Sequence, residues 1–159
     1  MMRYLIPLVL VVLTGCGWGK LERALIEAAS NGDIVQMSRL IDRGANVNGV
    51  ALDGWTPLTA AAAAGRLEAV KLLLMRGAEI DRTASTVTPL QWAAFDGHLD
   101  VARFLVESGG KLRLDPVLKA RFLDKVKSFK SDELLSLVLN AMSHEDVGVS
   151  GQPEFPAKR

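Results

Sequence analysis

The residues of this chain repeat at an interval of about 33 positions. Two series of glycines follow this interval: Gly32, Gly65 and Gly97, and Gly44, Gly77 and Gly109. Leucines and alanine pairs keep the same register: Leu25, Leu58 and Leu90, with Ala28-Ala29, Ala61-Ala62 and Ala93-Ala94. A period of this length is typical of stacked repeats, which generally offer extended surfaces for binding rather than pockets for chemistry.

Each repeated unit is expected to contain a loop, a short helix, a turn and a longer helix. In the second unit Asp53-Gly54 indicates the turn of the loop. Thr56 is a suitable N-cap, and Pro57 suits the first helical position, where its missing N–H costs nothing. Gly65 and Gly77 are expected to end the two helices.

The motifs within these units resemble the ankyrin repeat. The matching segments are Thr56-Pro57-Leu58 and Thr88-Pro89-Leu90, Gly65-Arg66-Leu67 and Gly97-His98-Leu99, and Gly44 to Asn48 and Gly77 to Asp81. The resemblance covers about residues 21–112. It implies an all-α ankyrin-repeat solenoid of helix–turn–helix units with β-hairpin-like loops.

We expect three repeats, at residues 21–48, 49–81 and 82–112, followed by a helical cap at 113–143 and a flexible tail at 144–159. The first repeat has Arg23-Ala24-Leu25 in place of the Thr-Pro opening, as suits a unit whose outer face meets water. In the cap, Asp115-Pro116 predicts a helix start, and Ser131 is a candidate N-cap for a second helix. This pair is expected to cover the end of the stack as a diverged fourth unit.

Residues 1–15 are expected to form a secretory signal peptide. Arg3 precedes an apolar run from Tyr4 to Leu13, which is shorter than the roughly 20 residues of a membrane-spanning helix. The run leads into Leu13-Thr14-Gly15-Cys16, which resembles the lipobox of bacterial lipoproteins. In that family the peptide is cut before the cysteine, whose thiol is acylated.

The lipobox resemblance implies lipidation of Cys16, the single cysteine of the chain, with residues 16–20 as a short tether. More than one acyl chain gives stable anchoring. Gly17 stands where an aspartate would resemble an inner-membrane retention signal, so we expect the outer membrane of a Gram-negative cell, with the domain facing the periplasm. The alternative is an uncleaved anchor with an idle thiol.

The charge of the chain is balanced, with 19 basic and 18 acidic side chains. Loss of the signal peptide removes Arg3 and makes the numbers equal. Nucleic-acid binding needs a basic footprint, so the composition predicts no nucleic-acid partner. We also expect a monomer that has no cofactor and no small-molecule substrate.

No catalytic or metal-binding constellation is recognisable in the sequence. His98 lies in the Gly-His-Leu motif, where the resemblance implies a hydrogen bond between repeats rather than catalysis. His144 lies in the predicted tail without neighbours at metal-ligand spacing. The glycines lie at helix ends and form no phosphate loop. We therefore expect a protein that is not an enzyme.

The ankyrin resemblance implies a protein-binding face formed by the loop tips and the exposed sides of the first helices. The residues predicted to contact a partner are Asp53, Trp55, Arg76, Val87, Trp92, Phe95 and Asp96. Aromatic side chains are typical anchors of interfaces. The competing interpretation is that Trp55 packs along its own loop, that Phe95 fills space beside small alanines and that Trp92 is half-buried between first helices.

Together these features predict a membrane-anchored, non-catalytic module that binds a protein partner in the cell envelope. An alternative is an immunity or inhibitor lipoprotein that neutralises a toxin or an envelope enzyme. A further alternative is a structural or stress-related component that supports another envelope protein. Partner identity is not encoded in any motif of the chain.

Overall fold

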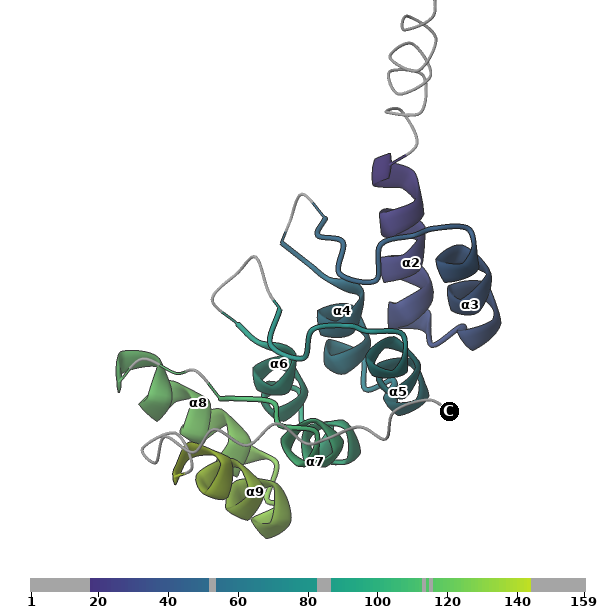
Figure 1. Cartoon of the computed structure of the whole chain (residues 1–159). Coiled ribbons are helices and arrows are strands. Elements are labelled where there is room, and N and C mark those ends of the chain that lie inside the picture. The colour runs from purple at the N-terminus through teal and green to yellow at the C-terminus, as the bar shows by residue number, and fades with distance from the viewer. Residues whose placement is uncertain (1–17, 52–53, 83–86, 113, 115, 144–159) are drawn as a thin grey trace, which may run out of the picture.

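The computed structural model describes residues 18–51, 54–82, 87–112, 114 and 116–143. These residues form helices and connecting turns, and contain no strand. The helices are α2 (Trp18–Asn31), α3 (Ile34–Asp42), α4 (Pro57–Ala63), α5 (Leu67–Met75), α6 (Pro89–Phe95), α7 (Leu99–Glu107), α8 (Pro116–Ser128) and α9 (Asp132–Ser143). They form four helical hairpins stacked side by side (Figure 1). This arrangement confirms the predicted all-α solenoid.

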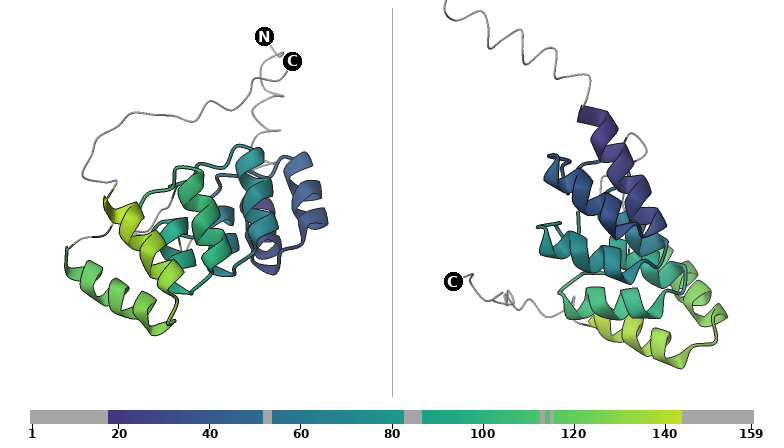
Figure 2. Two further views of the ribbon diagram at one scale, coloured as in Figure 1. Left: turned by 90° about the horizontal axis from the view of Figure 1, so that it is seen from below. Right: turned by 90° about the vertical axis from the view of Figure 1, so that its right-hand side faces the viewer.

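The hairpins build two layers. The first-helix layer contains α2, α4, α6 and α8, and the second-helix layer contains α3, α5, α7 and α9. Figures 1 and 2 show the two layers running side by side from the N-terminal to the C-terminal end of the stack. Each hairpin contacts its neighbours in the stack, so one continuous core runs through all of them.

Small and large side chains divide the core between the layers. Alanines fill the contact between α2, α4 and α6, where Ala61, Ala62, Ala93 and Ala94 are fully buried. Their small size lets first helices approach closely. Larger side chains fill the space between the layers, and Leu73 and Leu105 are also fully buried there.

Threonine caps start two of the first helices, as the sequence predicts. Thr56 Oγ1 accepts a hydrogen bond from Thr59 N at 3.1 Å, and Thr59 Oγ1 accepts one from Thr56 N at 2.7 Å. Thr88 and Gln91 make the equivalent reciprocal pair at the start of α6. These residues are buried, so the caps satisfy polar groups that water does not reach.

Side chains at the start of the second helices join neighbouring units. His98 Nε2 lies 2.9 Å from the carbonyl oxygen of Ala63 in the preceding unit. Arg66 occupies the corresponding place one unit earlier, and its Nε donates to Ser30 O at 3.1 Å. The structural role predicted for His98 is therefore confirmed.

The repeat register continues into α8 and α9 although the sequence motif is lost. Fully or nearly fully buried side chains recur at the repeat interval in the four second helices: Leu40, Leu73, Leu105 and Val138. Lys130 has φ 51, the left-handed conformation that Gly97 adopts one unit earlier. Ser131 Oγ accepts a hydrogen bond from Leu134 N at 3.2 Å and so caps α9. The last hairpin is thus a fourth unit in register with the others.

The first helix is longer than predicted at its N-terminal end. α2 begins at Trp18, so residues 18–20, which were expected to belong to the tether, are helical. Lys20, Leu21 and Glu22 are favourable helix formers, and Leu21 packs against the core. Residues 16 and 17 lie outside the described part of the chain.

Candidate protein-binding face

Three aromatic side chains form a row on the first-helix layer. The Trp55 and Trp92 rings stack with centroids 5.1 Å apart and an interplanar angle of 29°. The Phe95 ring meets Trp92 edge-on at 6.4 Å. Both tryptophans are half-buried, whereas Phe95 is 40% exposed. The row therefore leaves part of its apolar ring surface exposed to solvent and not packed in the core.

The loop and helix caps determine where these rings lie. Trp55 directly precedes the N-cap Thr56, and its carbonyl oxygen accepts a hydrogen bond from Ala51 N at 2.9 Å, which closes the loop. Trp92 and Phe95 lie three positions apart on α6, and therefore on the same side of that helix. Trp55 thus spans two units and does not pack only along its own loop.

Trp55 also forms one wall of a groove between α2 and α4. The groove has a volume of about 580 Å³. Its lining residues are Arg23, Ile26, Glu27, Ser30 and Asn31 from α2, Ala51 and Trp55 from the loop, and Ala60, Ala63 and Ala64 at α4. The α4 side carries only alanine methyl groups, which leave room for a larger side chain from outside.

A cation and a fourth aromatic ring extend the row at its other end. Lys125 Nζ on α8 lies 5.5 Å from the Phe95 ring centroid and 5.0 Å from that of Phe129. A Cβ on Gly97 would lie only 2.9 Å from the Phe129 ring, so the ring covers that turn. Lys125 and Phe129 were not among the predicted site residues. The sequence does contain a signal for them. One repeat interval after Gly97 falls at residue 130, so Lys130 and the adjacent Phe129 are expected at the turn between the last two helices.

The remaining predicted site residues lie on several different elements of the stack. Val87 is half-buried and directly precedes the N-cap Thr88, while Asp96 is exposed at the C-terminal end of α6 beside Phe95. Arg76 ends α5 in the second-helix layer, where its Nη1 lies 2.9 Å from Asp42 Oδ1. Arg76 is not among the residues that line the groove. Asp53 and Cys16 lie outside the described residues.

The described residues lack two kinds of functional feature. They contain no cluster of three or more His, Cys, Asp or Glu side chains that could hold a metal ion. Within the same part of the chain, no helix has both the length and the apolar character needed to cross a membrane. What the face presents is an aromatic row, a groove with an alanine wall and a cation.

The fold and the open face define a stacked-repeat protein with an extended binding surface. A family model described as "Ankyrin repeats (3 copies)" matches residues 4–84 and 25–115. The chain belongs to the ankyrin-repeat family. Ankyrin repeats are interaction modules and generally not enzymes, so membership implies protein binding.

Curated relatives agree with this assignment. The chain is 35% identical over 102 residues to ankyrin repeat and KH domain-containing protein mask-1 of Caenorhabditis elegans, which covers 63% of this chain and 4% of that protein. It is 42% identical over 62 residues to the 2-5A-dependent ribonuclease of Mus musculus, with 38% and 8% covered. It is 34% identical over 114 residues to protein phosphatase 1 regulatory subunit 27 of Mus musculus, with 65% and 73% covered. The chain thus spans less than a tenth of the first two relatives.

Proposed function

We propose that this protein is a non-catalytic module that holds a partner protein on its first-helix layer. The observation that carries this proposal is the row of Trp55, Trp92 and Phe95 beside the α2–α4 groove. Aromatic side chains that reach the surface beside a groove are typical anchors of protein interfaces. Membership of the ankyrin-repeat family supports the same function.

We further propose that the module is attached to a bacterial envelope membrane through acyl chains on Cys16. Support comes from the signal-like apolar run and the Leu13-Thr14-Gly15-Cys16 sequence. Because α2 begins at Trp18, an anchor at Cys16 would hold the stack close to the bilayer. The partner would then be a periplasmic protein or the periplasmic part of a membrane protein.

Replacement of Cys16 by serine is expected to release the protein from membranes. A serine cannot accept the thioether-linked lipid, and a chain without acyl groups loses the stable attachment that they provide. Fractionation of a Gram-negative host expressing either form measures the change, with the parent protein in the membrane fraction. Equal membrane recovery of both forms would show that the attachment does not depend on lipidated Cys16.

Trp55→Ala combined with Phe95→Asp is expected to abolish partner capture. Truncation of one hot-spot aromatic side chain costs about 2 kcal/mol or more, so loss of a single such anchor already weakens binding by more than about tenfold. The measurement is capture from envelope membranes with the chain from residue 17 onward, which contains every described helix. Identification of the captured protein separates a scaffold from an inhibitor, since an inhibitor would recover a toxin or an envelope enzyme.

Met75→Asp provides a matched control for this experiment. Met75 lies at the end of α5 in the second-helix layer and is 77% exposed. Like Phe95→Asp, Met75→Asp therefore places a negative charge at an exposed apolar position. The control should capture the partner as the parent does. If the double variant still captures the partner, or if Met75→Asp also loses it, the first-helix layer is not the binding face.

A further inference from the structure

The C-terminal end of the first-helix layer carries a local excess of positive charge. α8 contains four exposed cations, Lys119, Arg121, Lys125 and Lys127, against one carboxylate, Asp124. Lys130 follows α8 and is also exposed. In contrast, residues 18–112 contain ten basic and eleven acidic side chains. The near-neutral charge of the whole chain therefore hides a basic helix beside the aromatic row.

The cations of α8 form no ion pair with another residue of the described part of the chain. Among the described residues, the ion pairs are Glu68–Lys71, Asp42–Arg76, Glu79–Arg82 and Arg103–Glu133, and none involves α8. Arg121 and Lys125 lie four positions apart and thus on the same side of the helix. Like charges at this spacing destabilise a helix. A negatively charged partner would relieve that repulsion.

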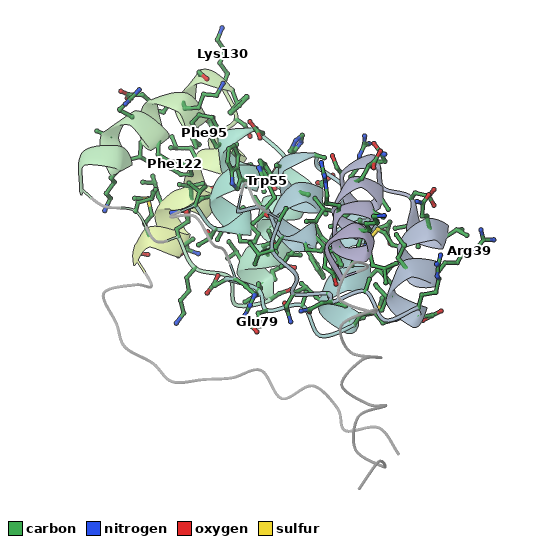
Figure 3. The ribbon with its side chains drawn as sticks, turned by 90° about the horizontal axis from the view of Figure 1, so that it is seen from above. Arg39, Trp55, Glu79, Phe95, Phe122 and Lys130 are labelled. Atoms are coloured by element: carbon green, nitrogen blue, oxygen red, sulfur yellow. The ribbon has the colours of Figure 1, made fainter. Side chains whose placement is uncertain are left out.

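Lys125 connects the basic helix to the aromatic row. Its ammonium lies near the rings of both Phe95 and Phe129, at 5.5 and 5.0 Å from their centroids. Cation–π contacts of this kind hold the ammonium in place while leaving its N–H groups able to donate hydrogen bonds. Figure 3 shows Phe95 between Trp55 and the α8–α9 hairpin, with Lys130 beyond it.

We propose that the partner of this face presents an extended segment with an apolar anchor followed by carboxylates. The anchor occupies the groove beside Trp55, and the carboxylates pair with Lys125 and Arg121. This inference rests on the proposed binding function and specifies the chemistry of the bound segment. The path from Trp55 to Lys125 has three steps. The Trp55 and Trp92 ring centroids are 5.1 Å apart, and those of Trp92 and Phe95 are 6.4 Å apart. Lys125 Nζ lies 5.5 Å from the Phe95 ring centroid. Roughly five residues of extended chain, at about 3.3 Å each, cover that path.

The position of α8 favours a protein segment over the other polyanions. Nucleic acid requires a basic footprint along the bound surface, whereas here the groove end carries both Arg23 and Glu27. An anionic membrane surface is disfavoured because α8 lies at the opposite end of the stack from the N-terminal helix α2, where the lipid anchor is proposed (Figures 1 and 2). A short segment with an apolar residue at one end and carboxylates at the other matches both ends of the face.

The test uses a synthetic peptide with one tryptophan, a spacer of about four residues and three glutamates. The spacer length follows from the length of the path between Trp55 and Lys125. Binding to the chain from residue 17 onward is followed by NMR titration. We expect saturable shifts at Trp55, Phe95 and Lys125 that weaken as salt rises. Arg121→Gln with Lys125→Gln should raise Kd about three- to tenfold at low salt, as for two surface ion pairs. Arg39→Gln with Arg43→Gln, which changes two arginines at the same spacing in the last turn and C-cap of α3, should leave Kd unchanged.

Several outcomes would overturn this inference. They are equal affinity for the peptide with lysines in place of glutamates, equal loss in the α3 control, no binding, or tighter binding to an oligothymidylate or to anionic phosphatidylglycerol vesicles. The proposed function has a separate readout in partner capture. If Trp55→Ala with Phe95→Asp abolishes capture while Arg121→Gln with Lys125→Gln does not, the binding function stands and only the acidic chemistry fails.

Discussion

Replacement of Gly65 by alanine is expected to lower the free energy of unfolding by about 2–3 kcal/mol. Gly65 has φ +68, a conformation that costs an alanine about 1–2 kcal/mol. Its new Cβ would also lie 2.5 Å from His98 Nδ1, so the imidazole must move. Movement weakens the contact between His98 Nε2 and the Ala63 carbonyl oxygen, which is worth about 1 kcal/mol.

Gly77→Ala separates the two contributions to this loss. Gly77 has φ +88, but no atom lies within 4 Å of a Cβ built on it, so only the backbone cost of about 1–2 kcal/mol applies. Urea denaturation of both variants gives the comparison, and in a His98→Ala background the Gly65→Ala change should cost only the backbone contribution, because the contact with Ala63 is already absent. Equal destabilisation at Gly65 and Gly77 would show that the His98 ring yields without cost.

Replacement of Leu73 by alanine is expected to lower the free energy of unfolding by about 3 kcal/mol. Leu73 is fully buried on α5, between units on both sides of the stack. Leucine-to-alanine changes in such positions remove transfer free energy and leave a cavity, at a cost of about 2–5 kcal/mol. Since whole domains are stable by only about 5–15 kcal/mol, the midpoint of urea denaturation should fall markedly.

Met75→Ala on the same helix is the control for this change. Met75 is 77% exposed, and truncation of an exposed side chain is expected to change the free energy of unfolding by less than about 0.5 kcal/mol. Similar losses for the two variants would mean that the inner side of α5 is not packed as the structure shows.

Helix caps and contacts between units were predictable where a short sequence motif contains the residues that form them. The caps at Thr56 and Thr88 follow from a threonine directly before a proline, and the structure has both. The link from His98 to the previous unit follows from its place in the Gly-His-Leu motif. Such features depend on short-range geometry that every copy of the repeat reproduces.

The aromatic row was only partly predictable. Trp55 and Trp92 occupy different positions within their units, so the repeat interval does not pair them, and the stack depends on how adjacent units are offset. Lys125 and Phe129 lie beyond the last recognisable motif, where the register survives in backbone shape alone. Lys130, for example, adopts without a glycine the conformation that glycine provides elsewhere. Offsets and conformations of this kind are tertiary properties that the sequence pattern does not state.

The division of α4 between two sides bears on how the protein can change over generations. Ala61 and Ala62 face the core and are fully buried, whereas Ala63 and Ala64 line the groove and are half-buried. A larger side chain at Ala61 or Ala62 would disturb the packing of the core. A larger side chain at Ala63 or Ala64 would alter only the shape of the groove that a ligand meets. Ligand preference can therefore drift by single substitutions while the scaffold persists, which makes this short helix an evolvable element.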